Sequence, residues 1–309
     1  MLGPLLLSAS RNRRARQVVT SAPGLRRVVS RFVPGAETGD VLAVTRNLIS
    51  ADLAVTIDYL GEDVRDTAQA RTVRDNYTRL LGQLADLGLA RGAEVSLKLS
   101  AVGRALAPDG DRVALDNARA ICAAAAAAGT TVTLDMEDHT RVTATLRLLA
   151  ELRPDFPDLG CVLQSYLRRS ADDCAGLTAA GSRVRLCKGA YRAPDGVAFA
   201  SSAEVDRSYA RCLRILLGGD GYPMLATHDP RLIRIAGTRA EVEGRAAGSF
   251  EYQMLYGIRP AEQRRLASGG ARMRVYVPYG SDWYGYLVRR LAERPANLAF
   301  FLRSLISTG

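Results

Sequence analysis

This 309-residue sequence lacks the features that mark several protein classes. Its five cysteines are an odd number and form no CxxC pair, so they indicate reduced thiols in a cytoplasmic protein, without a disulfide framework or a zinc site. Two histidines are too few for a multi-histidine centre, and we expect no metal. No apolar run approaches the ~18 residues that cross a bilayer. GxGxxG, P-loop, HExxH and GxSxG motifs are missing too, so a dinucleotide bound here would not use a Rossmann domain.

Positive charge is in excess, with 42 Lys and Arg against 32 Asp and Glu and a formal net charge of +10. Arginine supplies nearly all of it, and much lies in the first 31 residues. The excess fits an anionic partner, namely nucleic acid, an anionic membrane or an anionic ligand, and it equally fits a solvated surface. No recognised nucleic-acid motif accompanies it, so we expect no nucleic-acid partner.

Eight short runs rich in apolar and β-branched residues recur along the chain. They span residues 52–60, 94–100, 131–137, 161–167, 183–191, 222–229, 250–255 and 273–280. The stretches between them, such as 72–88 and 116–129, have the spacing of amphipathic helices. Strands that alternate with helices predict parallel βα units, and eight such units predict a closed (βα)8 barrel.

Polar residues gather late in these predicted strands. They are Lys98, Asp135, Glu137, Gln164, Arg185, Lys188, Thr227, His228, Asp229, Gln253 and Tyr276. In a parallel barrel the strand C-termini open onto one face, where active sites lie. Each of these residues, taken alone, is equally well explained as the first residue of a polar loop. Taken together, charged groups inside otherwise apolar strands favour a functional site.

Lys98 interrupts the apolar run VSLKLS, where alternation places Ser96, Lys98 and Ser100 on one face. A buried ammonium needs an anion, and Asp135 on the neighbouring strand is the expected partner. The pair is either purely structural or fixes Lys98 where it meets a substrate carboxylate.

Two further segments carry groups suited to anions. RVRLCKGAY places Arg183, Arg185 and Lys188 at the end of one strand, and the glycine and alanine that follow let backbone amides approach a ligand closely. A cation beside a flavin would stabilise the anionic reduced ring. Residues 286–293 have helical spacing that places two adjacent arginines on one face, able to clamp a carboxylate. The alternative for this helix is an exposed amphipathic face with i,i+4 pairs.

Seven segments, in this order and over about residues 45–309, resemble the proline dehydrogenase family. They are SLKLS, LDMED, VLQSYLRRS, RLCKGAY, LATHD, FEYQMLYG and YVPYGSDWYGYLVRRLAERPAN. Two positions depart from the family pattern, since Cys187 stands where an aliphatic residue is expected and Tyr252 where Phe is usual.

The resemblance implies a distorted (βα)8 TIM-type barrel with N-terminal helices and a C-terminal helix over the active site. Residues 1–45 would form a basic helical arm and residues 46–309 the barrel. FAD would bind noncovalently at the strand C-termini and take a hydride at N5 from L-proline, giving 1-pyrroline-5-carboxylate. The implied catalytic residues are Asp135, Arg185 and Tyr276. Substrate contacts would come from Lys98, Tyr191, Leu255, Tyr286, Arg289, Arg290 and Glu293. FAD contacts would come from Met136, Gln164, Arg185, Lys188, Gly189, Ala190, Thr227, His228, Gln253 and Met254.

The resemblance also implies partners. Reduced FAD would pass electrons to a membrane quinone, and a separate pyrroline-5-carboxylate dehydrogenase would perform the next step. We expect a cytoplasmic protein whose arginines in residues 11–31 attach it peripherally to the inner face of an anionic membrane. Alternatives are a flavin dehydrogenase of the same fold acting on hydroxyproline or another cyclic amino acid, a basic nucleic-acid-binding protein, and a barrel without activity that serves as a scaffold.

Overall fold

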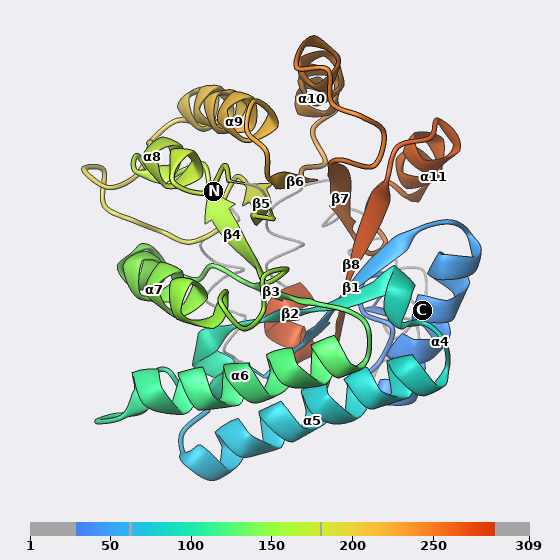
Figure 1. Ribbon diagram of the computed structural model, residues 1–309, viewed down its shortest axis with the longest axis vertical. Coiled ribbons are helices and arrows are strands. Elements are labelled where there is room, and N and C mark those ends of the chain that lie inside the picture. Colours follow the sequence, from blue (N-terminus) through green and yellow to red (C-terminus); the bar gives the residue numbers. More distant parts are fainter. Residues whose placement is uncertain (1–28, 62–63, 180, 288–309) are drawn as a thin grey trace, which may run out of the picture.

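In the computed structural model, which describes residues 29–61, 64–179 and 181–287, eight parallel strands close into a barrel (Figure 1). The strands are β1 (Ala54–Tyr59), β2 (Ala93–Leu97), β3 (Val132–Leu134), β4 (Gly160–Gln164), β5 (Arg183–Cys187), β6 (Tyr222–Ala226), β7 (Glu251–Leu255) and β8 (Met273–Tyr279). Each strand pairs with the next, and β8 pairs with β1. Each predicted run overlaps one strand, so the (βα)8 barrel is confirmed.

Helices surround the barrel (Figure 1). They are α4 (Thr38–Ser50), α5 (Thr67–Asp86), α6 (Gly110–Ala127), α7 (Val142–Leu152), α8 (Ser170–Ala175), α9 (Ser202–Leu217), α10 (Pro230–Val242) and α11 (Pro260–Ser268), with short 3-10 turns η1 (Ala90–Gly92), η2 (Leu99–Val102) and η3 (His139–Arg141). The helices predicted at 72–88 and 116–129 correspond to α5 and α6. Both begin earlier than predicted, because their first turns are polar and carry little of the apolar spacing.

Capping residues set several helix starts. Asp66 accepts a hydrogen bond from a backbone N–H in the first turn of α5 (2.8 Å). Ser201 and Glu204 form a capping box at the start of α9. Asp229 caps α10 directly after β6. Such side chains satisfy N–H groups that the helix itself leaves without partners.

Alternation along the strands separates two environments. In β8, Val275 and Val277 are fully buried within the apolar core between the barrel and its helices. Arg274 and Tyr276 alternate with them and form polar contacts inside the barrel. The period of two residues therefore gives an apolar outer wall and a polar interior.

The end of the expected N-terminal arm packs on the barrel. The expected boundary between residues 45 and 46 falls inside α4, which contacts β1 and β8. A second apolar cluster contains Val29, Phe32, Val33, Leu60, Ile258, Tyr286 and Leu287. It joins residues 29–33 to the helical residues 283–287. Among the described residues, no helix has the length and apolar character that crossing a bilayer requires.

Candidate active site

Asp135 is the centre of a polar cluster at the C-terminal mouth of the barrel. Its Oδ1 accepts a hydrogen bond from Arg185 Nη1 (2.8 Å), and its Oδ2 accepts one from the Tyr276 hydroxyl (2.7 Å). Lys98 Nζ lies 3.6 Å from the same Oδ2. Burial alone would raise the pKa of Asp135, but the positive charges of Lys98 and Arg185 and the Tyr276 hydrogen bond lower it below its ordinary value. The carboxylate is therefore held anionic.

Lys98 has a second and closer carboxylate. Its Nζ donates to both oxygens of Asp58, at 2.9 and 2.8 Å. The expected pairing with Asp135 is present, but Asp58 is the nearer partner. The two carboxylates fix the ammonium from two strands, since Asp58 belongs to β1 and Asp135 follows β3.

Tyr276 and Arg185 lie against each other beside Asp135. The Arg185 guanidinium carbon is 5.2 Å from the centre of the Tyr276 ring. Burial raises the pKa of Tyr276 well above its ordinary value, and the charges of Asp135 and Asp58 raise it further. The phenol therefore stays protonated and serves as a hydrogen-bond donor.

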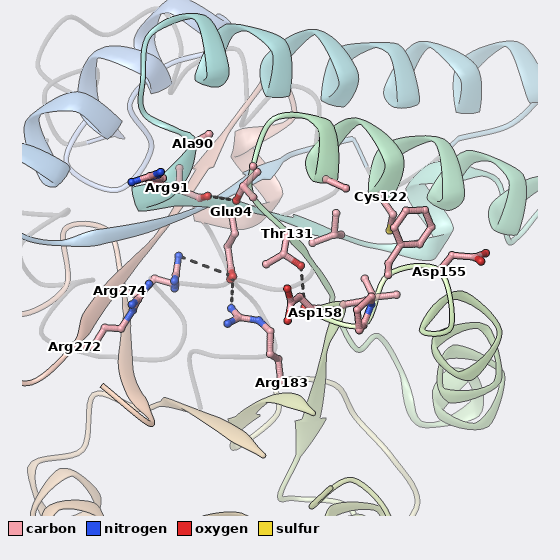
Figure 2. Close-up of a pocket in the computed structure, with 18 residues that line it drawn as sticks. Ala90, Arg91, Glu94, Cys122, Thr131, Asp155, Asp158, Arg183, Arg272 and Arg274 are labelled. Carbon is pink, nitrogen blue, oxygen red and sulfur yellow. Dashed lines mark hydrogen bonds and ion pairs between the residues drawn. The ribbon is translucent and has the colours of Figure 1, made fainter. Parts of the chain in front are cut away.

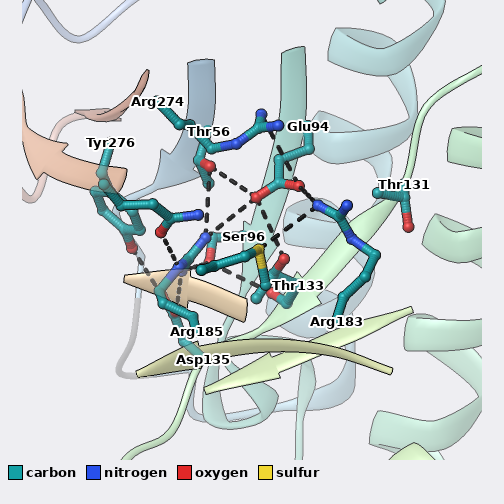
Figure 3. Close-up of polar contacts among 12 residues, drawn as sticks. Thr56, Glu94, Ser96, Thr131, Thr133, Asp135, Arg183, Arg185, Arg274 and Tyr276 are labelled. Atoms are coloured by element: carbon teal, nitrogen blue, oxygen red, sulfur yellow. Dashed lines mark hydrogen bonds and ion pairs between the residues drawn. The ribbon is translucent and has the colours of Figure 1, made fainter. Parts of the chain in front are cut away.

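A buried network beneath this cluster holds Arg185 in place (Figure 3). Its Nε donates to Gln253 Oε1 (2.6 Å), and its Nη2 lies 3.2 Å from Glu94 Oε1. Glu94 also accepts from Thr56 (2.7 Å) and Arg183 (2.7 Å). Burial would raise the pKa of Glu94, but three arginines bring it down to about 2.

Charges inside the barrel are balanced among the described residues. The ion pairs join four cations with largely buried side chains to four carboxylates: Lys98, Arg183, Arg185 and Arg274 to Asp58, Glu94, Asp135 and Glu251. Arg272, whose side chain is exposed just before β8, forms a further ion pair with Glu251. An isolated buried charge would be very costly, whereas paired and hydrogen-bonded charges are tolerated. An anionic ligand entering this interior would need a further cation.

Arg183 belongs to the opposite mouth, which corrects its expected place beside Arg185 at a strand end. It opens β5, so the rise along the strand carries Arg185 roughly 7 Å further toward the C-terminal mouth. Figure 2 shows Arg183 with Glu94 and Arg274 at a cavity of about 500 Å³ among the N-terminal strand ends. The Glu94 and Arg274 side chains there already belong to the buried network.

One group of expected cofactor contacts follows β4 and β5. Gln164 Nε2 donates to the carbonyl oxygen of Met136 (3.1 Å). Gln164 Oε1 is buried and has no hydrogen-bond partner in the part of the chain that the structure describes. Gly189 has φ +101°, and a Cβ there would lie 2.2 Å from the ring of Tyr166. Only glycine fits this turn, and Ala190 continues it.

Lys188, in the same turn, points to carboxylates at the start of α10 and on α9. Its Nζ lies 2.5 Å from Asp206 Oδ1 and 3.4 Å from Asp229 Oδ2. Thr227 Oγ1 accepts a hydrogen bond from the backbone N–H of Asp229 (3.1 Å). His228 Nε2 accepts one from a backbone N–H at the end of β7 (2.9 Å), which leaves the proton on Nδ1.

The two expected contacts from β7 lie on opposite faces. Gln253 faces the interior, where its Oε1 accepts from Arg185 and its Nε2 donates to Glu251 (2.6 Å). The Met254 side chain points to the opposite face of β7 and is buried in the apolar core outside the barrel. Only its backbone can therefore face the C-terminal mouth.

The expected substrate wall is described in part. Leu255 ends β7 and, like Tyr286, packs in the second apolar cluster, whereas Tyr191 is 38% exposed. The helix expected from residue 286 begins at residue 283. Arg289, Arg290 and Glu293 lie outside the described residues.

Several site residues were missed by sequence reasoning, namely Thr56, Asp58, Glu94, Glu251 and Arg274. Asp58 carries the same signal that singled out Lys98, a charge late in an otherwise apolar strand. Glu94, Glu251 and Arg274 occur early in their strands, so a search restricted to strand C-termini passes over them.

Comparison with known proteins agrees with this geometry. The family model described as "Proline dehydrogenase" matches residues 41–303. Proline dehydrogenase 1 of Bacillus subtilis (strain 168) is 36% identical over 306 residues, covering 99% of each chain. Proline dehydrogenase of Deinococcus radiodurans is 39% identical over 281 residues, covering 90% of each. Proline utilization A from Bdellovibrio bacteriovorus, inactivated by N-propargylglycine, matches with a TM-score of 0.80 and 26% identity over 91% of this chain. This chain spans 34% of that longer protein.

Proposed function

This chain belongs to the proline dehydrogenase family, and we propose that it oxidises L-proline to 1-pyrroline-5-carboxylate, with the hydride passing to N5 of a bound FAD. The observation that carries this proposal is the anionic Asp135, which contacts Arg185, Tyr276 and Lys98 at the C-terminal mouth. In (βα)8 barrels this mouth is where catalytic residues lie.

The residues at this mouth fit FAD. The buried Gln164 Oε1 has no hydrogen-bond partner among the described residues and offers an acceptor to a ligand N–H group. Gly189 has a left-handed backbone, and the Tyr166 ring lies where a Cβ would stand, so this turn presents one fixed shape to a cofactor. We propose that these groups hold FAD together with Met136, Lys188, Ala190, Thr227, His228, Gln253 and Met254. When bound, FAD would supply the hydride acceptor, and Arg185 would supply a fixed positive charge beside its ring.

Proline brings one carboxylate and one ring nitrogen to the site. Because the interior charges already balance, the carboxylate requires cations beyond those paired in the network. We propose that Arg289 and Arg290 supply them as forked donors, oriented by Glu293, with Lys98 as the third contact. Tyr191, Leu255, Tyr286 and Tyr276 would enclose the apolar ring.

Asp135 has two tasks in this proposal. It orients Arg185 and Lys98 through charge-assisted hydrogen bonding and ion pairing. Loss of a hydride from the carbon beside nitrogen leaves positive charge on that nitrogen, and a fixed carboxylate nearby stabilises it. Because its pKa is lowered, Asp135 acts as a charge and not as a proton donor.

We propose that the electrons then pass to a membrane quinone, and that a separate pyrroline-5-carboxylate dehydrogenase uses the product. The protein would be cytoplasmic, with peripheral attachment to an anionic membrane through arginines of residues 11–31. Of those arginines, Arg31 is described in the structure, and the others lie outside the described residues.

The visible spectrum of the purified protein tests the proposal. We expect flavin absorption that bleaches when L-proline is added without oxygen. Faster bleaching by trans-4-hydroxy-L-proline would transfer the assignment to the hydroxyproline alternative. A colourless protein that takes up no FAD would contradict the flavin proposal as a whole.

A further inference from the structure

Exposed charge is distributed unevenly over the helices. On α9, α10 and α11, one exposed carboxylate, Glu241, accompanies seven exposed arginines: Arg207, Arg211, Arg214, Arg231, Arg234, Arg264 and Arg265. On α4 to α8, five exposed arginines face seven exposed carboxylates: Arg46, Arg71, Arg79, Arg112 and Arg147 against Asp40, Asp75, Asp86, Asp111, Asp116, Glu151 and Asp172. We call the exposed side chains of α9, α10 and α11 the basic face.

The basic face is continuous around one side of the barrel. The three helices follow one another outside β5 to β8 (Figure 1), and α9 packs directly on α10. Two of its arginines are bonded to carboxylates, Arg231 to Asp229 and Arg265 to Glu262. The remaining five extend from α9 to α11.

Apolar side chains stand in the middle of the basic face. Ile235 is 44% exposed and Val242 is 67% exposed, and both lie on the outer side of α10. A shallow groove of about 560 Å³ runs along them, lined also by Arg234 and Thr238. Exposed apolar side chains flanked by arginine are a feature of helices that lie in a membrane interface. Nucleic acid would offer these apolar side chains no partner.

We propose that the basic face, and not the arginines of residues 11–31 alone, docks the protein on an anionic phospholipid bilayer, with α10 lying along the headgroups. Arginines around the rim would contact lipid phosphates, while Ile235 and Val242 would enter the boundary below them. Asp229, which caps the start of α10, also contacts Lys188 of the proposed cofactor turn. Docking would therefore place the cofactor end of β6 near the bilayer, where a lipid-soluble acceptor resides.

This inference rests on the proposed function, because docking serves electron transfer to a membrane acceptor. Vesicle binding is measured without turnover, so failure of the docking proposal can be distinguished from failure of the proposed function. The full chain is sedimented at about 0.1 M salt, where the Debye length is about 10 Å, with vesicles of phosphatidylglycerol in phosphatidylcholine, and with phosphatidylcholine alone. The test variant carries Arg211→Gln, Arg234→Gln and Arg264→Gln. An arginine near anionic lipid contributes about 1 kcal/mol, or about fivefold in partition, so we expect roughly a hundredfold loss.

The matched control carries Arg71→Gln, Arg79→Gln and Arg147→Gln, which remove the same charge from α5 and α7. We expect it to bind vesicles almost as the unmodified protein does, because exposed charges beyond a Debye length are screened. Equal loss in both variants would show that only net charge matters and would overturn the proposal. So would absence of vesicle binding by the unmodified protein.

Two further variants separate the remaining explanations. Ile235→Ser with Val242→Ser should weaken vesicle binding and leave retention on DNA unchanged. If the basic-face variant loses DNA retention but keeps vesicle binding, the partner is nucleic acid and the proposal is wrong. It is also wrong if binding is lost only when the arginines between residues 11 and 27 are replaced by glutamine.

Discussion

Replacing Glu94 by Gln should destabilise the barrel in a way that depends on pH. Glu94 is buried, and its ordinary pKa of 4.5 is lowered to about 2 by Arg274, Arg183 and Arg185, against the effect of burial. Each pKa unit corresponds to about 1.4 kcal/mol, so the charged form contributes about 3 kcal/mol to folding at pH 7. Because the folded pKa is depressed, this contribution is complete above pH 4.5 and is lost as the pH falls toward 2. By linkage, about 1 kcal/mol should remain at pH 3.

Urea denaturation measures this at both pH values. At pH 7 we expect the variant to lose at least the ionisation contribution, since three arginines are left facing a neutral amide. At pH 3 the difference between the two proteins should shrink by about 2 kcal/mol. Glu151→Gln on α7, an exposed carboxylate outside the network, serves as the control. If the difference between Glu94→Gln and the unmodified protein is the same at both pH values, the reasoning from the buried network is refuted.

Three further changes test the proposed site. Arg289→Lys or Arg290→Lys should raise KM for proline about tenfold to a hundredfold, because lysine lacks the planar fork of arginine and a charged hydrogen bond contributes about 1.5–3 kcal/mol. An unchanged KM in both variants, with FAD still bound, would contradict the proposal that these arginines bind the substrate carboxylate. Asp58→Asn removes the carboxylate nearer to Lys98, so steady-state kinetics should show KM for proline raised roughly tenfold with flavin content unchanged. An unaltered KM would count against a substrate role for Lys98. Gly189→Ala requires a left-handed backbone that costs about 1–2 kcal/mol, and its Cβ would meet the Tyr166 ring, so the turn must shift. Titration of the apoprotein, followed by flavin fluorescence, should then show FAD affinity lowered about tenfold or more; equal affinity would contradict a role for this turn in cofactor binding.

The barrel was predictable because its strands are short apolar runs between polar or glycine-rich turns. The centre of the site was predictable for the same reason: Lys98 and Asp135 are charged residues that interrupt such runs. Helix starts were harder, since the polar first turn of α5 depends on the Asp66 cap and carries little apolar periodicity.

The partners of the buried charges could not be read from the sequence. β2 pairs with both β1 and β3, so Asp58 and Asp135 were both within reach of Lys98, and only the register decides which is nearer. The pairing of Thr56 with Glu94 likewise comes from register. Strand period alone predicts that Arg183 and Arg185 share a face, but their assignment to opposite mouths depends on where β5 begins.

Closure of the barrel has a consequence for synthesis of the chain. β1 and β8 pair along their whole length, and Arg274 donates to the carbonyl oxygen of Val55 across 219 positions of sequence (2.9 Å). A chain still emerging from the ribosome completes β1 long before β8 exists. Until then β1 and the latest strand each present an unpaired edge, which is a template for pairing with other chains. Emergence of β8 therefore ends the interval in which the nascent barrel is open to aggregation, and a product truncated before β8 would keep both edges exposed.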